Sequence, residues 1–382
     1  MKKRIAIIGS TGTIGVQALD VIEAHKELFE VTLLSANNNS ELLIEQAINH
    51  NVRNVVIGNQ KLFHSVKEHL VPLGINVMGG NDSITQYIST STDIDLLLTA
   101  MVGFSGLEPT LAGISKGLTV AIANKEPVVA AGEIIMRMAK KHNATILPVD
   151  SEHSAIFQAL QGEHSPIENI FLTASGGPFL NTPVEELEKV SVAQAINHPR
   201  WKMGKKITVD SSTLMNKGFE VIEARWLFDV APHKIKVLVH PESIIHSMVS
   251  FSDGSIIAQM NMPDMRLPIQ YALTYPKREF LNIPRVDFYK LGALTFNEPD
   301  LSKFPLLRIA LEALDKGGNT PCILNAANEV AVEAFLQERI KFTEIERIVL
   351  KSLEQCEFIA KPTLEEIFHS DRNTREIAQK LI

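Results

Sequence analysis

The feature that most constrains this chain is the segment RIAIIGSTGTIGVQALDVIEAH at residues 4–25. A short apolar run leads directly into three glycines, Gly9, Gly12 and Gly15, and then into an amphipathic helical pattern. A strand, a glycine turn and a helix in this order present free backbone N–H groups and a positive helix dipole to a phosphate. The spacing is G-x-x-G-x-x-G rather than the usual G-x-G-x-x-G, but the flanking strand and helix are the context such a site requires. We therefore predict a nucleotide-binding turn here.

Residues 1–150 alternate β-rich runs with helical patterns such as SELLIEQAINH. Alternation of this kind predicts βαβ units and a mostly parallel, Rossmann-like sheet. The predicted strands are Arg4–Ile8, Glu30–Ser35, Asn54–Ile57, Leu96–Thr99, Thr119–Ala123 and Thr145–Pro148.

The rest of the chain changes character twice. Residues 151–276 mix strands with Gly- and Pro-rich loops, and two alternating runs joined by SDGS predict an antiparallel hairpin. Residues 277–300 show little periodicity and are interpreted as a linker, whereas residues 301–382 are helical in pattern, for example NAANEVAVEAFLQERI. The 382 residues are thus predicted to form an α/β domain (1–150), an α+β domain (151–276) and a C-terminal helical domain (301–382).

Composition excludes several classes of protein. A net charge of −7 argues against a nucleic-acid partner, which would need a concentrated basic surface. The first apolar run is too short for a signal peptide, and the apolar stretch near residue 125 is interrupted by Lys125 and Glu126, so no membrane span is expected. Cys322 and Cys356 have no metal or redox spacing, and we expect two reduced thiols in a cytoplasmic protein.

The turn after the second strand bears on the choice of cofactor. NAD-binding proteins usually place an acid there, on the ribose 2′-hydroxyl. This chain has LLSANNNS instead, with three asparagines and no acid, so a 2′-phosphate would not be repelled. No Lys or Arg stands at the turn to attract one, so the residues permit NADP without proving a preference for it.

Carboxylates gather after the last predicted strand of the first region. Asp150 and Glu152 follow that strand, and Glu220 lies near the start of a helix with one apolar face. Three carboxylates form an all-oxygen set, which suits Mg²⁺ or Mn²⁺ rather than zinc. His153 is expected to be a packed or surface side chain rather than a ligand, and Glu223 an exposed or Arg-paired helix residue.

Two other stretches suggest a site for an anionic substrate. The run LTASGGPF ends a strand in Ser175 and two glycines, which can offer a hydroxyl and backbone amides to an anion. Ser211, Asn216 and Lys217 could supply further donors. The loop NHPRWKMG is interpreted as a lid that excludes water, with the alternative that Trp201 fills the core.

Taken together, these stretches resemble one family. The matching motifs occur in the family's order from about residue 4 to residue 340: GSTGTIG, ANKE, LPVDSEHSAIFQ, ASGGPF, HPRWKMGKKI, VDSSTLMNKGFEVIEARWLF, HPESIIHSMV and NAANEVAVEAFL. The chain resembles the 1-deoxy-D-xylulose 5-phosphate reductoisomerases, NADPH- and divalent-metal-dependent enzymes of the non-mevalonate isoprenoid pathway.

The resemblance implies a role for individual residues. The metal ligands would be Asp150, Glu152 and Glu220. The substrate contacts would be Lys125, Ser151, Glu152, Ser175, His198, Ser211, Asn216, Lys217 and Glu220. The NADPH contacts would be Thr11, Gly12, Thr13, Ile14, Asn37, Asn38, Asn39, Asn124, Glu126 and Gly204. The catalytic candidates are Lys125, Glu152, His198, Lys217 and Glu220, with the general acid or base left open between Lys125, Glu152 and a water on the metal.

The resemblance also implies the reaction and the assembly. An NADPH-dependent oxidoreductase would isomerise and reduce 1-deoxy-D-xylulose 5-phosphate to 2-C-methyl-D-erythritol 4-phosphate, with Mg²⁺ or Mn²⁺, or Co²⁺ as a third option. The family is dimeric, so residues 151–276 would serve catalysis and dimerisation, with a flap at 198–204 containing Trp201 and Met203. The departure is Asn38, where family members often carry a basic residue. The alternatives are another NADP-dependent dehydrogenase of a small metabolite and a non-catalytic NADP-binding regulator.

Overall fold

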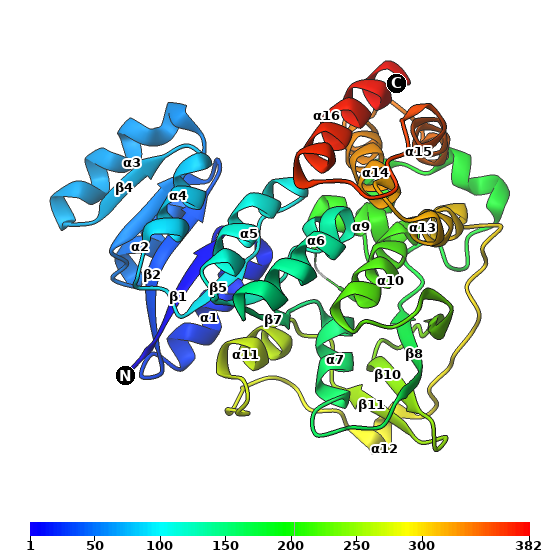
Figure 1. The fold of residues 1–382 in the computed structure, drawn as a ribbon. Coiled ribbons are helices and arrows are strands. Elements are labelled where there is room, and N and C mark those ends of the chain that lie inside the picture. The colour runs from blue at the N-terminus through cyan, green and yellow to red at the C-terminus, as the bar shows by residue number, and fades with distance from the viewer. Residues whose placement is uncertain (202) are drawn as a thin grey trace. The chain divides into compact units, whose positions relative to one another are not determined.

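The computed structural model describes residues 1–201 and 203–382. Its contacts group the chain into two compact units (Figure 1). The first unit consists of Met1–Pro127, Ile135–Ser154 and Asp264–Asn282, and the second of Val128–Ile134, Ala155–Pro263 and Ile283–Ile382. This grouping counts residues 264–282 with the N-terminal sheet, and the domain boundaries predicted from sequence remain a proposal.

The first unit is built on a seven-stranded, wholly parallel sheet in the order β4-β3-β2-β1-β5-β6-β7. Its strands are β1 (Lys3–Ile8), β2 (Phe29–Ala36), β3 (Asn54–Ile57), β4 (Asn76–Gly79), β5 (Leu96–Thr99), β6 (Thr119–Ile122) and β7 (Thr145–Pro148). The six strands predicted from sequence are confirmed. β4 was not predicted, because four residues, two of them Asn and Gly, give too weak a β pattern.

Helices connect these strands as the parallel topology requires. They are α1 (Thr13–Ala24), α2 (Ser40–Asn49), α3 (Phe63–Leu70), α4 (Asp82–Thr90), α5 (Leu107–Ser115) and α6 (Glu126–His142), with the short 3₁₀ helices η1 (Gln60–Leu62), η2 (Val71–Leu73) and η3 (Phe104–Gly106). α7 (Ser151–Ala159) follows the last strand, β7. α11 (Arg266–Thr274) returns from far along the chain and packs against α1 (Figure 1). Ile5 to Ile8 have no exposed surface, as expected for a strand covered on both faces.

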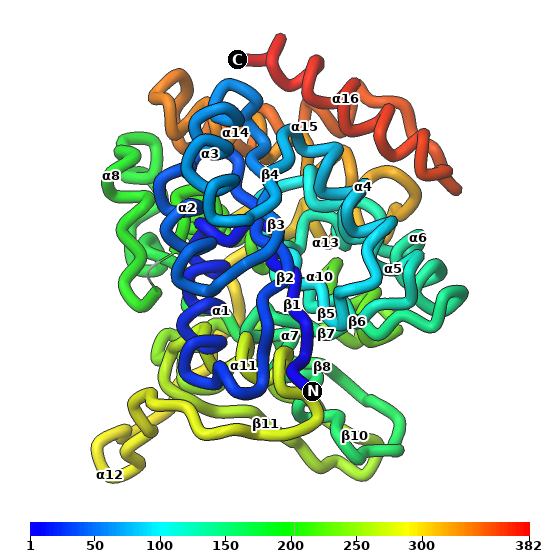
Figure 2. The backbone as a smooth tube through the Cα atoms, turned by 90° about the vertical axis from the view of Figure 1, so that its left-hand side faces the viewer, coloured from blue at the N-terminus to red at the C-terminus, as the bar shows by residue number. Residues whose placement is uncertain are grey.

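The strand order of the first sheet determines where a ligand can lie. The chain moves outward from β1 to β4 on one side and from β5 to β7 on the other, so the order reverses between β1 and β5 (Figure 2). In open α/β sheets ligands bind beyond the carboxyl ends of the strands at such a reversal. The glycine turn follows β1 at this point.

The second unit contains a four-stranded mixed sheet in the order β11-β10-β8-β9. The strands are β8 (Ile167–Ala174), β9 (Ile235–Val239), β10 (Ile245–Phe251) and β11 (Ile256–Met260). β8 is parallel to β9 and antiparallel to β10, and β10 pairs with β11 in the hairpin predicted from SDGS.

Helices complete the second unit and supply most of its core. They are η4 (Val184–Lys189), α8 (Val192–Ala195), α9 (Lys205–Ser212), α10 (Met215–Leu227), η5 (Pro232–Lys234), α12 (Phe288–Leu291), α13 (Pro305–Lys316), α14 (Thr320–Leu336), α15 (Glu344–Gln355) and α16 (Leu364–Lys380). α10 packs on α13, and α14 packs on α15 and α16. One apolar core joins these helices to β8 and β10. None of the helices in the described part of the chain is both long and apolar enough to cross a membrane.

The space around Gly15 and Gly12 predicts different effects of alanine substitution on stability. A Cβ on Gly15 would lie 2.4 Å from the Gly9 carbonyl oxygen, whereas one on Gly12 would lie 3.4 Å from the same atom. We expect Gly15→Ala to cost about 1–3 kcal/mol because the loop backbone must move, which lowers the melting temperature of the first unit by roughly 2–12 °C. Thermal unfolding followed by circular dichroism would measure this. Gly12→Ala is the control and should melt within about 2 °C of the wild type; equal effects of the two variants would contradict the steric argument.

Candidate active site

The glycine turn between β1 and α1 is built to receive an anion. Gly9 has a φ of +87°, and its N–H donates to the Ser35 carbonyl oxygen (3.1 Å). Gly12 is the N-cap of α1, and no side chain caps that helix end. The N–H groups of the first turn of a helix have no intrahelical partner. Gly12 and Thr13 are exposed and Thr11 and Ile14 partly so, which leaves this turn open to a phosphate.

The three asparagines after β2 are all exposed. Asn39 caps α2 by accepting a hydrogen bond from the Leu42 N–H (3.2 Å). Behind the glycine turn, the buried Ser10 donates to Gln46 Oε1 (2.8 Å) and accepts at its carbonyl oxygen from Gln46 Nε2 (3.0 Å). This exchange fixes the turn to α2, so the two turns that would contact a dinucleotide are held by one helix.

The ends of β6 and β7 bring together two of the predicted residues. Ile122 pairs with Pro148 at the ends of these parallel strands, so the residues that follow lie at the same sheet edge. Lys125 comes three residues after β6 and Asp150 two after β7, and Lys125 Nζ lies 2.5 Å from Asp150 Oδ2. The Lys125 side chain is 6% exposed and that of Asp150 14%. The Asp150 carboxylate thus forms an ion pair with Lys125 in a mostly buried position.

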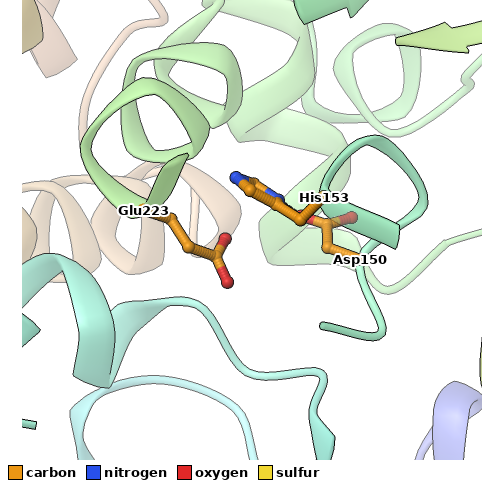
Figure 3. A group of neighbouring side chains, drawn as sticks. All are labelled: Asp150, His153 and Glu223. Atoms are coloured by element: carbon orange, nitrogen blue, oxygen red, sulfur yellow. Dashed lines mark ion pairs between the residues drawn. The ribbon is translucent and has the colours of Figure 1, made fainter. Parts of the chain in front are cut away.

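The start of α7 supplies further oxygen atoms beside this pair. The Ser151 N–H donates to Asp150 Oδ1 (3.0 Å), and Ser151 Oγ donates to Glu152 Oε2 (2.5 Å). His153 is fully buried, with Nδ1 3.8 Å from Asp150 Oδ2; Figure 3 shows both side chains at this helix start. His153 is therefore buried rather than a surface side chain. Before α6, the buried Asn124 Nδ2 donates to Glu126 Oε2, so these two predicted cofactor contacts also lie together.

In the second unit, β8 ends at the predicted anion site. Gly176 and Gly177 have φ values of +85° and +69°, which turn the chain sharply after Ser175. A Cβ on Gly177 would lie 2.6 Å from the Ser211 carbonyl oxygen, so this glycine allows the turn to approach α9 closely. Ser175 and Ser211 therefore lie on adjoining segments of the same unit.

α10 carries the next group of predicted residues. Asn216 Nδ2 donates to Glu220 Oε1 (2.5 Å), and Lys217 Nζ contacts Glu220 Oε2 and donates to the Thr173 carbonyl oxygen at the end of β8 (2.5 Å). Lys217 and Glu220 are almost completely buried. Glu223, one turn further along α10 (Figure 3), is 1% exposed, so of the two expectations, an exposed or an Arg-paired side chain, the exposed one was wrong. Helical spacing alone did not distinguish a buried carboxylate from a solvated one.

The predicted flap is tied back to the second unit. His198 Nδ1 accepts hydrogen bonds from the N–H groups of Arg200 (3.1 Å) and Trp201 (2.9 Å), and Nε2 lies 3.0 Å from Ser175 Oγ. Because Nδ1 is an acceptor, the proton resides on Nε2, which donates to the serine. Trp201 is half-buried, and its ring meets the His246 ring edge-on with 5.9 Å between the ring centroids. It is not part of the main apolar core of the second unit. Met203 is also half-buried, Gly204 is the exposed N-cap of α9, and Lys202 lies outside the described residues.

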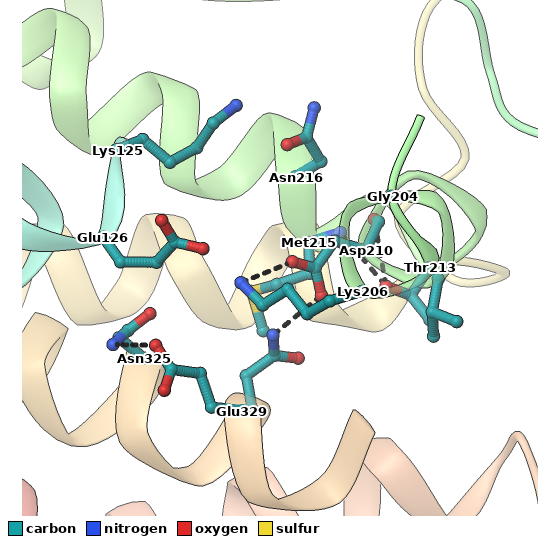
Figure 4. A network of polar contacts seen from close by, with 12 residues as sticks. Lys125, Glu126, Gly204, Lys206, Asp210, Thr213, Met215, Asn216, Asn325 and Glu329 are labelled. Atoms are coloured by element: carbon teal, nitrogen blue, oxygen red, sulfur yellow. Dashed lines mark hydrogen bonds and ion pairs between the residues drawn. The ribbon is translucent and has the colours of Figure 1, made fainter. Parts of the chain in front are cut away.

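A polar network on α9 and α14 was not predicted from the sequence. Asp210 is 1% exposed; its Oδ2 accepts from Lys206 Nζ (2.8 Å) and its Oδ1 from Asn328 Nδ2 (2.8 Å). Asn325 donates to Glu329 on the same face of α14 (3.1 Å); Figure 4 shows this pair beside Lys206 and Asp210. The available signal was the motif NAANE, whose asparagines interrupt an otherwise apolar helix.

Each unit therefore assembles one part of the predicted site. The first holds the nucleotide turns and the group at the ends of β6 and β7, including Asp150 and Glu152. The second holds Ser175, His198, Ser211, Asn216, Lys217 and Glu220. A doubly wound sheet with a phosphate turn, combined with buried carboxylates and a cluster of anion donors, defines a class: dinucleotide-dependent enzymes that act on small anionic substrates.

Comparisons with known proteins narrow this class. Residues 5–132 match the family model described as 1-deoxy-D-xylulose 5-phosphate reductoisomerase, residues 146–228 that of its C-terminal domain, and residues 260–377 that of the DXP reductoisomerase C-terminal domain. The 1-deoxy-D-xylulose 5-phosphate reductoisomerase of Porphyromonas gingivalis is 52% identical over 382 residues, which are 100% of this chain and 99% of the relative.

Two solved structures agree along the whole chain. The Zymomonas mobilis reductoisomerase in complex with NADPH has a TM-score of 0.92 and 41% identity, covering 100% of this chain and 99% of that one. A DOX-P reductoisomerase in complex with NADPH, fosmidomycin and magnesium has a TM-score of 0.93 and 37% identity, covering 99% and 98%. The chain belongs to the 1-deoxy-D-xylulose 5-phosphate reductoisomerase family.

The environment of His198 predicts an abnormal titration. Burial lowers the pKa of His198 to about 4. Because the pKa is about 6.5 in the unfolded chain, the unfolded chain takes up this proton first as the pH falls. The stability contributed by neutral His198 is thus complete above pH 6.5 and is lost between about pH 6.5 and pH 4. An NMR titration of ¹⁵N-labelled histidines, assigned with His198→Gln, should give a midpoint below about 5 and an Nε2-protonated ring at pH 7; a midpoint near 6.5 would contradict this.

Proposed function

We propose that this chain converts 1-deoxy-D-xylulose 5-phosphate to 2-C-methyl-D-erythritol 4-phosphate by isomerisation and NADPH-dependent reduction, with a divalent metal. The observation that carries the proposal is the match to reductoisomerases along the full chain. Each unit also brings together several of the proposed cofactor, metal or substrate residues. The enzyme is an oxidoreductase of the non-mevalonate isoprenoid pathway, and its substrate is a small sugar phosphate.

The residues of the first unit fit NADPH. The uncapped N-terminus of α1 offers backbone N–H groups for a pyrophosphate, and a side chain at Gly9 would collide with the Ala100 carbonyl at 2.5 Å. Thr11, Gly12, Thr13 and Ile14 would bind the pyrophosphate. The asparagines at 37–39 would contact the adenosine end, Asn124 and Glu126 would add to these contacts, and Gly204 of the second unit completes the proposed cofactor set.

The proposed metal ligands are Asp150, Glu152 and Glu220. Each is an oxygen donor, and two of them already face a cation within their own unit: Lys125 at Asp150 and Lys217 at Glu220. Hard oxygen donors of this kind suit Mg²⁺ or Mn²⁺, with Co²⁺ as a third candidate. When bound, the metal polarises the substrate carbonyl and acidifies the neighbouring hydroxyl.

The second unit would hold the phosphate of the substrate. Lys217 brings a positive charge, and Ser175, Ser211 and Asn216 bring neutral donors on adjoining segments. His198 is neutral at pH 7 and donates from Nε2, so it can hydrogen-bond the phosphate without a further buried charge. Binding energy from this remote group fixes the reacting carbons in place. Closure of the flap over them would exclude water during hydride transfer.

The proposed proton-transfer groups are the side chains of Lys125 and Glu152. Lys125 Nζ can donate a proton, and Glu152 can accept one at the oxygen that now receives the Ser151 hydroxyl. Both lie beside Asp150 in the first unit. The choice between Lys125 and Glu152 is testable by comparing the pH profiles of Lys125→Gln and Glu152→Gln.

The proposed metal site predicts a selective loss of turnover. Glu220→Gln should lower kcat by about 100-fold or more, because a neutral amide is a poor ligand for a hard cation. Its NADPH dissociation constant should change less than about 2-fold, since the cofactor turns lie in the first unit. Oxidation of NADPH at 340 nm with 1-deoxy-D-xylulose 5-phosphate and Mg²⁺ or Mn²⁺ would measure this, and excess EDTA should abolish the wild-type rate.

The matched control for this experiment is Glu223→Gln. Glu223 is also a buried glutamate on α10, one turn further along, and is not among the proposed ligands. Near-normal turnover of Glu220→Gln, or an equal loss in both variants, would remove Glu220 from the metal set. A folded wild-type protein that binds NADPH but oxidises none of it with any divalent metal would refute the proposed reaction itself.

We also propose a homodimer joined along β11. This strand is the edge of the second sheet, and Ile256 and Ile257 on it are 56% and 36% exposed. An open strand edge with exposed apolar side chains favours pairing with another chain.

We also propose that the enzyme is cytoplasmic. Its two cysteines are free thiols, which fits the reducing environment of the cytoplasm.

Light scattering after size exclusion tests the dimer. We expect the wild type to elute at about twice the chain mass of 42.3 kDa. Ile257→Lys should shift the protein to the monomer, because it places a charge on the apolar edge. Val184→Lys, which adds the same charge at an exposed apolar position outside this sheet, should remain dimeric. A monomeric wild type, or equal behaviour of both variants, would contradict the edge-to-edge arrangement.

A further inference from the structure

The neutral turn after β2 leaves open which group recognises the 2′-phosphate of NADPH. The side chains of this turn, Asn37, Asn38 and Asn39, are exposed and uncharged. An enzyme that distinguishes NADPH from NADH needs a donor or a cation for this phosphate. Given the proposed use of NADPH, the turn that lies beside Asn38 becomes the nearest place from which such a group can come.

The turns after β2 and β3 are joined by backbone hydrogen bonds. Ala36 and Ile57 are paired at the ends of these parallel strands. Beyond them, the Gly58 N–H donates to the Ala36 carbonyl oxygen (2.8 Å) and the Asn59 N–H to the Asn37 carbonyl oxygen (3.0 Å). The sheet pairing therefore continues past both strands, and the segment that opens η1 lies against the asparagine turn.

Side chains extend this connection to Lys61. Asn59 Nδ2 donates to Asn38 Oδ1 (2.9 Å), while Asn59 Oδ1 accepts from the Lys61 N–H (3.0 Å). The amide group of Asn59 thus links the Asn38 side chain to the Lys61 backbone. The Asn38 Oδ1 and Lys61 N atoms are therefore within about 8 Å of each other, the sum of two hydrogen bonds and one amide width. A lysine side chain reaches about 6 Å from its Cα. Because Asn38 Oδ1 is an acceptor here, its Nδ2 is directed away from Asn59 as a donor.

η1 is also held on its other side. A Cβ on Gly80 would lie 2.6 Å from Gln60 Nε2, so the Gln60 side chain packs closely against the turn after β4. The Lys61 side chain is exposed, and within residues 1–201 and 203–382 no acidic group forms an ion pair with its ammonium. The backbone of Lys61 is therefore fixed while its charge is available. The acid closest in sequence to the asparagine turn is Glu41, in the exposed first turn of α2.

We propose that Lys61 is the specificity-determining residue for NADPH over NADH. Its ammonium supplies the positive charge for the adenosine 2′-phosphate, and the Asn38 amide supplies a hydrogen-bond donor. Recognition thus comes from the turn after β3, two residues beyond the Asn59 bridge, rather than from a basic residue in the turn after β2.

Calorimetric binding of NADPH and NADH to the full-length protein tests this assignment. Lys61→Ala should weaken NADPH binding about 10-fold, a change of about 1.4 kcal/mol, because a charge-assisted contact is lost. NADH binding should change less than 2-fold, and Lys61→Arg should keep the wild-type preference. Lys67→Ala removes another exposed lysine, on α3 rather than η1, and should bind both cofactors as the wild type does.

A second probe separates this inference from the proposed reaction. Adenosine 2′,5′-bisphosphate and AMP differ only in the 2′-phosphate, and their affinities do not depend on turnover. Lys61→Ala should remove most of the wild-type preference for the bisphosphate. If the wild type turns over with NADPH and Lys61→Ala keeps the full preference, the assignment of Lys61 is wrong. Absence of any wild-type preference would also overturn it, whereas intact binding without turnover would count against the reaction alone.

Discussion

The residues assigned here depend on one constraint: parallel strands end at the same edge of a sheet. The glycine turn follows β1, the asparagine turn follows β2, and Lys125 and Asp150 follow β6 and β7, so all four meet at one edge of the first sheet. In the second unit, Ser175 follows β8, which runs parallel to β9. Residues distant in sequence therefore become neighbours without any need for direct contact between the helices that separate them.

Buried ion pairs make these strand ends rigid. Taking a lysine and a carboxylate out of water costs several kcal/mol per ion unless each finds a partner and further hydrogen bonds. Lys217 meets this condition through both Glu220 and the Thr173 carbonyl oxygen, and Asp150 through Lys125 and the Ser151 N–H. Such pairs add little stability compared with an apolar core. Their effect is to fix charged atoms in position before a substrate arrives, which lowers the reorganisation needed on binding.

The sequence predicted the strands well because apolar runs in a parallel sheet are continuous and bounded by clear turns; Asn54–Ile57 and Leu96–Thr99 agree with the structure residue for residue. Several proposed site residues directly follow those strands, so their place at the ends of the strands could be inferred from the sequence, whereas their roles remain a proposal. The sequence did not reveal that Glu223 is buried, since helical periodicity records spacing and not the burial of a polar residue. It also missed the contact of Asp210 with Asn328, which joins residues 118 positions apart and depends on tertiary packing alone.

That contact gives the C-terminal helices a role that their sequence did not suggest. α9 is a poor helix by itself: it has eight residues, no side-chain cap, and a run of Thr, Val, Asp and Ser, all of low helical propensity. It nevertheless follows the flap directly and carries Ser211. Asn328 on α14 holds Asp210 from one side, and the neighbouring Glu329 is held by Arg375 of α16 (2.6 Å), which also pairs with Asp371. The last helices thus stabilise a helix that its own sequence favours only weakly, and they set the position at which the flap ends.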